Sequence, residues 1–242
     1  MTGTLSSVRS DHEEAASGHH QTRWVPPTGS TTITLLRHGA SEGYVPGAPF
    51  PLIDGHGDPA LAPDGHAQAA LAGARLAAEH RSGRTISALY VTTLTRTHQT
   101  AAPLAAELGL EPVVVADLRE VFLGDWEGGM FREKAAEGHP AAVEAIEGGE
   151  WGAVPGAETT AELSERVMRS LVELAERHRD QRIVCVVHGG VIAAALSTVL
   201  GGRASLFLGA DNCSISTLVR VGDRWRMRSF NDTAHLDGGM GA

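Results

Sequence analysis

The sequence predicts an α/β fold, a three-layer α/β/α sandwich in which helices cover both faces of a mostly parallel central sheet. Two apolar runs, 33–36 and 183–187, end at turns that contain glycine, and runs of this kind are typical of strands buried on both faces. Segments with helical periodicity alternate with the strands, as in layered α/β domains. With 242 residues and 42% hydrophobic content, the chain can form one substantial core. We therefore expect a single domain over residues 31–242.

Residues 1–30 differ in composition from the rest of the chain, because Ser, Thr, Gly, His and charged residues dominate them. They contain no apolar stretch as long as the core of a signal peptide or a membrane span. We therefore expect a disordered N-terminal tail and a cytoplasmic protein. The histidines of this tail, His12, His19 and His20, are expected to be solvated. Residues 24–27 (Trp-Val-Pro-Pro) are expected to dock locally before the first strand.

The first half of the domain is expected to run as strand, helix, strand and helix. After the strand at 33–36, residues 61–80 carry small and apolar residues at the spacing of one helical face, namely Ala67, Leu71, Ala74 and Ala78. A strand at 86–91 and a short turn then lead into a helix that ends near residue 109. Thr95 is the expected N-cap of this helix.

The second half continues the alternation. Residues 112–115 form a short apolar stretch, and the helix before the run at 183–187 carries a regular apolar face made of Leu163, Val167, Leu171 and Leu174. Residues 212–219 and 224–230 are then expected to form a closing pair of strands. The two cysteines predict no disulfide framework, and Cys185 is expected to be a small buried residue of the core.

Two histidines follow the two apolar runs at matching positions. His38, preceded by Arg37, comes after the first run, and His188 comes directly after the second. Open α/β sheets carry their chemistry at the carboxyl ends of strands, so we expect the two histidines to share one site. For either histidine alone, a purely structural, hydrogen-bonded role is an equal alternative; the matching positions of the pair favour function.

Two further segments add charged groups. Arg96 is expected in the first turn of its helix, where the helix dipole disfavours a cation, so a bound anion there would relieve the conflict. The alternative is a solvated surface arginine. Residues 117–128 place acids beside Phe122 and Trp126, where a carboxyl group would sit against apolar walls.

Four segments of the chain, in order, resemble the signatures of the histidine phosphatase superfamily, the phosphoglycerate mutase-like proteins. They are residues 37–39 (Arg-His-Gly), 93–101, 118–128 and 188–190 (His-Gly-Gly). The resemblance implies a phosphoglycerate mutase-like fold. It also implies that His38 is the nucleophile, that Glu120 is the acid, and that phosphate binds to Arg37, Arg96, His188, Gly189 and Ser41.

The chemistry of a phosphomonoester supports these roles. The ester is a dianion, so an attacking nucleophile needs donors aimed at the nonbridging oxygens, and the planar fork of arginine suits that task. His38 must attack through an unprotonated nitrogen, and nearby positive charge favours its neutral form. Attack would give a phosphohistidine. Glu120 would protonate the leaving alkoxide and then take a proton from water; the alternatives for this role are Asp117, Asp125 and Glu127.

This scheme requires no metal ion and no cofactor, because two arginines and a histidine take the place of a cation. The segment 54–58 (Asp-Gly-His-Gly-Asp) has no zinc-site spacing, and we expect it to form a glycine-rich turn whose aspartates cap or bend the loop. The formal net charge of −9 argues against nonspecific binding to nucleic acid or to an anionic membrane surface. The expected partner is a small phosphorylated metabolite, and a homodimer is left open.

Two features distinguish hydrolysis from mutase activity within the resemblance. Tyr44 stands where mutases have an asparagine, and the connection from Glu120 to His188 is shorter than in mutases, which favours hydrolysis. The apolar loop 43–53 either walls the pocket, binds a partner or packs on the rim of the sheet. We expect a metal-independent phosphatase of the histidine acid phosphatase type that acts on small phosphomonoesters. The alternatives are a phosphoglycerate mutase and a non-catalytic protein that binds a phosphorylated ligand.

Overall fold

A six-stranded sheet forms the centre of the protein, in the order β5-β4-β6-β1-β7-β8. The computed structural model describes residues 24–236. The first four strands in this order are parallel, and β7 and β8 are antiparallel additions at one edge. The strands are β1 Ser30–Arg37, β4 Ala88–Val91, β5 Val113–Val114, β6 Arg182–Val187, β7 Ile215–Val221 and β8 Arg224–Asp232. The predicted mostly parallel sheet and the closing pair of strands are both confirmed.

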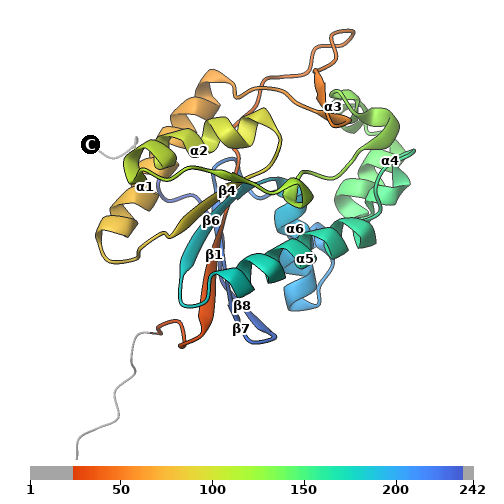
Figure 1. Cartoon of the computed structure of the whole chain (residues 1–242). Helices are drawn as coiled ribbons and strands as arrows, with labels where there is room; N and C mark the ends of the chain where they lie inside the picture. Colours follow the sequence, from red (N-terminus) through yellow and green to blue (C-terminus); the bar gives the residue numbers. More distant parts are fainter. Residues whose placement is uncertain (1–23, 237–242) are drawn as a thin grey trace, which may run out of the picture.

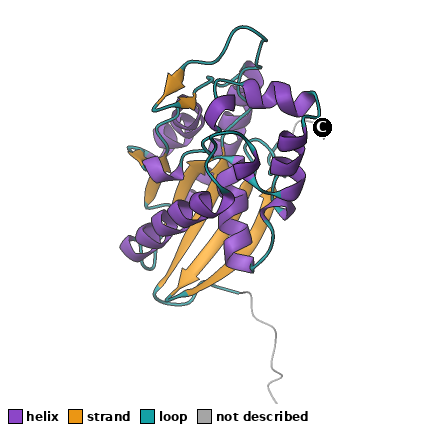
Figure 2. Cartoon of the chain, turned by 90° about the vertical axis from the view of Figure 1, so that its right-hand side faces the viewer, coloured by secondary structure: helices purple, strands orange, loops and turns teal. Residues whose placement is uncertain are grey.

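Helices cover both faces of this sheet (Figures 1 and 2). The main helices are α1 Pro63–Arg81, α2 Thr95–Leu108, α3 Met130–Ala136, α4 Pro140–Val143, α5 Thr160–Arg177 and α6 Gly189–Leu200. Short helical turns are η1 Ala116–Leu118, η2 Gly124–Trp126, η3 Glu144–Gly148, η4 Trp151–Ala153 and η5 Ala204–Leu206. The buried residues form two clusters, one shared by the sheet with α5 and α6 and the other with α1 and α2. The three-layer architecture is therefore confirmed.

Successive residues of β6 explain why two cores form. Ile183, Cys185 and Val187 join the cluster on the α5 and α6 side, whereas Val184 and Val186 join the cluster on the α1 and α2 side. Side chains of a strand point alternately to opposite faces, so an unbroken apolar run supplies both cores at once. The expected burial of Cys185 is confirmed.

Helix α5 has the apolar face that the sequence predicts. Its predicted face of Leu163, Val167, Leu171 and Leu174 is buried. The helix begins with a capping box, in which Thr159 and Glu162 each satisfy a free backbone N–H of the first turn. In this helix the local capping residues and the burial of the apolar face are both consistent with the helix that the sequence predicts.

The predicted face of α1 is wrong. Ala67, Leu71, Ala74 and Ala78 are all exposed, and Leu71 keeps 46% of its surface accessible. The buried face consists instead of Gly65, Ala69, Ala72, Gly73, Leu76 and Ala77. Alanine occurs on every side of this helix and therefore marks no face, and α1 packs against α2 through its smallest residues: a Cβ on Gly73 would lie 3.0 Å from Pro103.

The segment 54–58 forms a tight turn, as predicted. It joins the two short strands β2 Leu52–Ile53 and β3 His56–Gly57. Asp54 and Gly55 occupy the turn with φ of 49° and 83°, the left-handed conformation that two-residue hairpin turns require. No group of three or more His, Cys, Asp or Glu residues within 24–236 has an arrangement that would hold a metal ion.

Asp58, after the hairpin, caps α2 from a distance. The helix begins at Thr95, with Leu94 at the N-cap position and no side-chain cap of its own, so the prediction of Thr95 as N-cap is wrong by one residue. Asp58 Oδ1 accepts a hydrogen bond from the Thr95 N–H at 2.8 Å, and Oδ2 accepts one from its hydroxyl at 2.6 Å. A carboxylate at this position is also stabilised by the positive end of the helix dipole.

The chain enters the described part of the structure beside β8. The guanidinium carbon of Arg228 lies 3.9 Å from the ring centroid of Trp24, so Trp24 docks as expected, whereas residues 25–27 are exposed. The rest of the predicted tail up to residue 23, including His12, His19 and His20, lies outside the described residues. Between residues 24 and 236, no helix combines the length and the apolar character needed to cross a membrane.

Gly65 provides a stability test of the contact between α1 and the loop after β1. A Cβ on Gly65 would overlap the backbone of Ala40, which cannot move without displacing the end of β1. We expect Gly65→Ala to lower the free energy of unfolding by about 1–3 kcal/mol, as overpacking does. Gly43→Ala is the matched control, because nothing lies near its added methyl group. Equal denaturation midpoints in urea for the two variants would contradict the close contact.

Candidate active site

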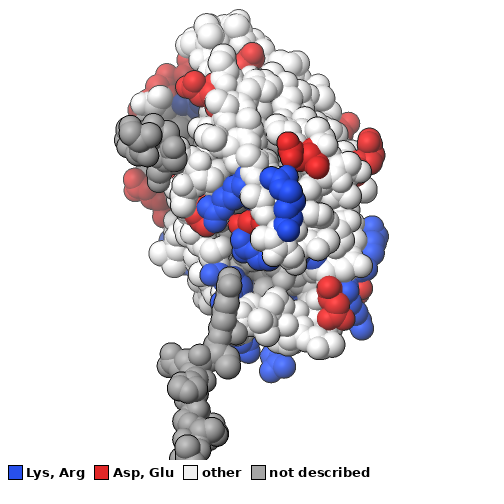
Figure 3. Space-filling view, turned by 90° about the vertical axis from the view of Figure 1, so that its left-hand side faces the viewer, with Lys and Arg blue, Asp and Glu red and all other residues white. Residues whose placement is uncertain are grey.

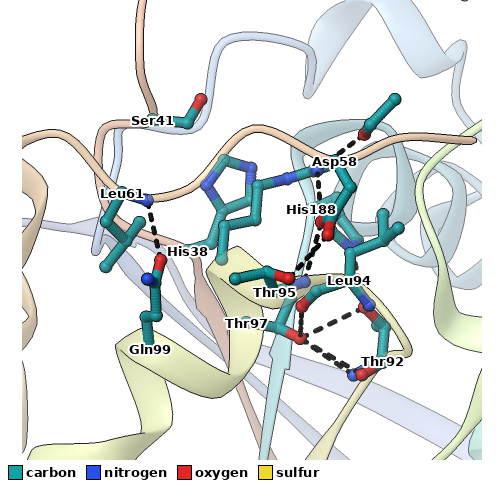
Figure 4. Close-up of polar contacts among 12 residues, drawn as sticks. His38, Ser41, Asp58, Leu61, Thr92, Leu94, Thr95, Thr97, Gln99 and His188 are labelled. Carbon is teal, nitrogen blue, oxygen red and sulfur yellow. Dashed lines mark hydrogen bonds and ion pairs between the residues drawn. The ribbon is translucent and has the colours of Figure 1, made fainter. Parts of the chain in front are cut away.

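The parallel pairing of β1 with β6 brings the two strand-ending histidines together. Arg37 pairs with Val187 at the ends of the strands, and the ring centroids of His38 and His188 lie 5.1 Å apart. Figure 4 shows both rings beside the first turn of α2. A cavity of about 400 Å³ opens over this edge. Arg37, His38, Ser41, Arg96 and Glu120 of the predicted site line this cavity, whereas His188 and Gly189 are not part of its lining.

The His38 ring is held in the form that a nucleophile requires. Its Nδ1 lies 2.8 Å from the carbonyl oxygen of Gly39, so Nδ1 carries the proton and Nε2 keeps its lone pair. Burial, and then the positive charges of Arg96 and Arg37, hold the pKa of His38 well below its ordinary value of 6.5. The expectation that surrounding charge favours a neutral ring is confirmed in direction, although burial is the larger cause.

His188 is fully buried at the N-terminus of α6. Its Nε2 lies 3.1 Å from the hydroxyl of Thr92, and its Nδ1 has no hydrogen-bond partner among the described residues. When the Thr92 hydroxyl donates to Nε2, Nδ1 carries the proton and is an unsatisfied donor. Burial, followed by the charge of Arg96, lowers the pKa of His188 well below 6.5. The lowered pKa favours a neutral His188 ring instead of the positive charge that the sequence-based scheme assigned to it, and the tautomer protonated on Nδ1 would offer an N–H group.

Backbone carbonyl groups fix the two predicted arginines. Arg37 Nη1 donates to the carbonyl of Ala210, and Arg96 Nη1 donates to that of Gly57 at 3.0 Å. Arg96 is only 7% exposed, so the alternative of a solvated surface arginine is wrong. Burial lowers the pKa of both guanidinium groups, and the charge of Glu120 partly opposes this effect. Both remain cations, because even a lowered arginine pKa lies far above neutral pH.

Two buried nitrogen atoms of the predicted site residues have no hydrogen-bond partner among the described residues. Within residues 24–236, the Arg37 Nε and His188 Nδ1 atoms are both buried and without a partner. Gly189 leaves room beside Arg37 Nε, since a Cβ on Gly189 would lie 3.6 Å from that atom. A buried donor without an acceptor is costly, and Arg37 lines the cavity, where an oxyanion would supply an acceptor for its Nε. Of the residues predicted to bind phosphate, Arg37, Arg96 and Ser41 line the cavity, whereas His188 and Gly189 lie next to His38 and Arg37.

Glu120 comes from the loop after η1 and faces the same cavity. Its Oε1 accepts from the Val121 N–H at 3.0 Å, and its Oε2 accepts from the Gly190 N–H at 3.2 Å. The absence of a side chain at Gly190 is required, because a Cβ there would collide with the carboxyl group. The second histidine motif therefore also holds the acid.

The apolar wall beside Glu120 differs from the one expected. Phe122 packs against His56, and Trp126 packs against His139 in the cluster of buried residues next to α5. Neither lines the cavity, whereas Trp151 does. Trp151 comes from η4, far along the chain, so no local pattern links it to Glu120.

The other acids of residues 117–128 are placed differently. Asp117 pairs with Arg169 at 2.9 Å on the surface, and Asp125 is exposed. Glu127 lines the cavity, but its two carboxylate oxygens accept hydrogen bonds from the N–H groups of Leu123 and Gly57 at 2.8 and 2.6 Å. Glu127 thereby fastens the β2–β3 hairpin to the loop before η2.

Arg132 is a third arginine of the cavity, and the sequence analysis missed it. It lies on α3, where its Nη2 donates to the Ser41 hydroxyl at 2.8 Å and its Nη1 to the Glu42 carbonyl at 2.7 Å. Its guanidinium also stacks over Phe50, 5.1 Å from the ring centroid. Phe50 lines the cavity, so loop 43–53 contributes one side chain to the pocket wall. Arg132 sits in a charged stretch without periodicity, and nothing local distinguishes it from a solvated surface residue.

The chain belongs to the histidine phosphatase superfamily (branch 1), whose sequence profile matches residues 33–233. It is similar to phosphoglycerate mutase-like protein 4 of Arabidopsis thaliana, with 32% identity over 85% of this chain and 86% of that protein. A metal-independent phosphoserine phosphatase of the same plant is 30% identical over 85% of this chain and 83% of its own. Among solved structures, a mycobacterial glucosyl-3-phosphoglycerate phosphatase matches with a TM-score of 0.67 and 26% identity, covering 84% of this chain and 100% of that one.

The lowered pKa values of His38 and His188 predict a loss of stability in mild acid. Both histidines titrate near pH 6.5 in the unfolded chain and well below it in the folded protein. Below about pH 6.5 the unfolded state therefore binds more protons, and the free energy of unfolding falls by up to about 1.4 kcal/mol per pH unit for each histidine. Urea denaturation across this range measures the slope. His38→Gln is expected to reduce it, and an unchanged slope would contradict a neutral buried ring.

Proposed function

We propose that this protein is a metal-independent phosphatase that hydrolyses small phosphomonoesters through a phosphohistidine on His38. The observation that carries the proposal is the neutral His38 ring, whose Nδ1–H is held by Gly39 and whose Nε2 is unprotonated beside buried guanidinium groups. Similarity to proteins named as phosphatases supports the same reaction class. Within that class, we assign the chain to the histidine acid phosphatase type.

The first half of the proposed reaction transfers the phosphoryl group to the enzyme. His38 Nε2 forms a bond to phosphorus while the bond from phosphorus to the ester oxygen breaks, and Glu120 gives its proton to the departing alkoxide. Arg37, Arg96 and the N–H of His188 stabilise the charge on the nonbridging oxygens. The backbone N–H of Gly189 is a further donor at this helix N-terminus.

The second half returns the enzyme to its starting state. Ionised Glu120 takes a proton from water, the water oxygen bonds to phosphorus, and the bond from phosphorus to His38 Nε2 breaks. Inorganic phosphate leaves, Glu120 is again protonated, and Nε2 regains its lone pair. No residue changes its net protonation over one cycle, and no cation other than the guanidinium groups enters the charge balance.

The third arginine indicates the class of leaving group. A phosphoryl group with two charges is matched by Arg37 and Arg96, whereas Arg132 makes hydrogen bonds only to a hydroxyl and a carbonyl oxygen. Phosphoserine and glucosyl-3-phosphoglycerate, which appear in the names of the relatives, both carry a carboxylate. We propose that the substrate is a small phosphomonoester with a second anionic group that binds near Arg132.

A phosphoglycerate mutase is the second candidate, because a phosphoglycerate mutase-like protein is 32% identical to this chain. A mutase would return the phosphoryl group to a retained hydroxy acid instead of water. Incubation with a monophosphorylated hydroxy acid distinguishes the two reactions, since a phosphatase releases inorganic phosphate and a mutase yields an isomer.

Several broader expectations accompany this proposal. We propose one catalytic domain over residues 31–242 and a cytoplasmic location for the protein. The net charge of −9 and the interspersed acidic and basic side chains on the face in Figure 3 support a small-molecule partner over nucleic acid or a membrane surface. A homodimer is compatible with this proposal and is tested by sedimentation.

His38→Ala tests the nucleophile. We expect the variant to lose turnover while it stays folded, because the mutation removes the attacking nitrogen but no large group of the core. Brief incubation of the wild-type protein with a phosphorus-labelled substrate should give an acid-labile, base-stable phosphoprotein. Chelators should not affect the activity. A near wild-type rate for His38→Ala, or silencing by EDTA and recovery with a divalent ion, would refute the mechanism.

Glu120→Gln tests the acid. Alkyl alcohols need a donated proton in order to leave, whereas a low-pKa phenol departs without one. We therefore expect a much larger loss of kcat/KM with alkyl phosphates than with an activated aryl phosphate. Equal losses on the two kinds of substrate would mean that Glu120 only shapes the pocket, and Glu127→Gln would then be examined as the alternative acid.

Arg132→Gln tests the class of leaving group. We expect KM for a carboxylate-bearing phosphomonoester to rise by on the order of 10- to 100-fold, the effect of losing one charged hydrogen bond. KM for a neutral alkyl phosphate of similar size should change much less. A comparable rise with both substrates would place Arg132 on the phosphoryl group instead.

A further inference from the structure

The backbone around the nucleophile is held by side chains from three other segments of the chain. Asn212 Nδ2 donates to the His38 carbonyl at 2.9 Å. The N–H on the other side of the same peptide, that of Gly39, donates to the Thr100 hydroxyl at 3.0 Å, and the next N–H, that of Ala40, donates to Gln68 at 2.9 Å. These bonds fix the peptide that follows His38 and the carbonyl of Gly39, which in turn holds the His38 ring by its Nδ1.

The loop that carries Asn212 is itself pinned to the end of β1. The Cys213 N–H donates to the carbonyl groups of both Arg37 and His38, at 3.1 and 3.3 Å, and Arg37 Nη1 donates to Ala210 in the same loop. Cys213 has φ of 56°, a left-handed conformation that residues other than glycine rarely adopt. The surrounding contacts must therefore maintain this conformation.

The C-terminal segment supplies those contacts. Asn231 and Asp211 exchange two hydrogen bonds of 2.7 and 2.8 Å. His235 Nε2 donates to the Cys213 carbonyl at 3.0 Å. A register shift between β7 and β8 occurs next to this point.

Helix α1 anchors the segment in turn. Arg75 binds both carboxylate oxygens of Asp232, at 3.0 and 2.5 Å, and a paired guanidinium fork of this kind restricts both groups geometrically. A continuous set of contacts therefore runs from Arg75 through residues 231–236 and loop 210–214 to the carbonyl of His38. We call residues 210–214 and 231–236 the C-terminal clasp.

We propose that Asn212 is a positioning residue for the His38 nucleophile, and that the C-terminal clasp holds Asn212 in place. This inference rests on the phosphatase activity proposed above. The clasp contributes no atom to the chemistry. The clasp keeps the Gly39 carbonyl where that oxygen accepts a hydrogen bond from His38 Nδ1–H. Nε2 of His38 then stays unprotonated and aimed at phosphorus.

Asn212→Ala tests the direct contact. A nucleophile that is misplaced or in the wrong tautomer should lower kcat by on the order of 10- to 100-fold, with little change in KM, because the arginines that bind phosphate are untouched. Nitrogen-15 NMR of the His38 ring in the unliganded protein should show the Nδ1–H tautomer in the wild type and a mixture in the variant. A kcat within about twofold of wild type, or an unchanged tautomer, would overturn the proposal.

Two variants of His235 test the clasp at a distance. His235→Ala removes the donor to the Cys213 carbonyl, whereas the amide of His235→Gln can replace it, and both variants lose the ionisable ring. We expect kcat to fall in the first and to return toward the wild-type value in the second. Equal kcat values for the two variants would overturn the clasp, and this comparison also decides the matter if Asn212→Ala does not fold.

His80→Ala is the matched control for a merely structural effect. His80 also makes one hydrogen bond to backbone, accepting from the Ile86 N–H at 3.1 Å, but it lies in the last turn of α1, away from the cavity. The His80→Ala substitution should lower the melting temperature of the protein without changing kcat or the His38 tautomer. If the wild type releases no phosphate from any phosphomonoester, the proposed function fails, whereas the tautomer comparison still decides the positioning.

Discussion

The parallel pairing of β1 with β6 is the constraint on which the site depends. Parallel neighbours end at the same edge of a sheet, so residues that follow each strand meet without any long-range signal between them. The register that pairs Arg37 with Val187 brings the His38 and His188 rings together over one cavity. Helices α2 and α6 begin at this same edge, where Asp58 accepts from the Thr95 N–H and Glu120 accepts from the Gly190 N–H, and the positive ends of both helix dipoles favour negative charge.

Burial then determines how each charged group behaves. Cations enclosed away from water lower the pKa of neighbouring imidazoles, and desolvation acts in the same direction. The two histidines are therefore neutral and the arginines keep their charge, while the Glu120 carboxyl group lines the same cavity as Trp151. The site therefore places the lone pair of His38 Nε2 close to the positive charges of Arg37 and Arg96.

The predictable part of the molecule is the part with local signals. Apolar runs identified β1 and β6, their ends identified His38 and His188, and a regular apolar face identified the buried side of α5. The face of α1 could not be identified, because alanine appears on all of its sides and close packing selects glycine and alanine over Leu71. The sequence could not predict Arg132, Trp151 or Asn212 either. Each reaches the site from an irregular segment or a short helix whose position depends on tertiary packing. Their local sequence carries no periodicity that marks them.

The base and the tip of the β2–β3 hairpin differ in how well each tolerates a change in the length of the chain. Its base is rigid, since Gly57 accepts from Arg96 and donates to Glu127 while Asp58 caps α2. Its tip, Asp54 and Gly55, is exposed to solvent. Lengthening the tip would leave the base and its hydrogen bonds intact. A longer turn can therefore be accommodated at this hairpin while Arg96, Glu127 and α2 keep their hydrogen bonds to its base.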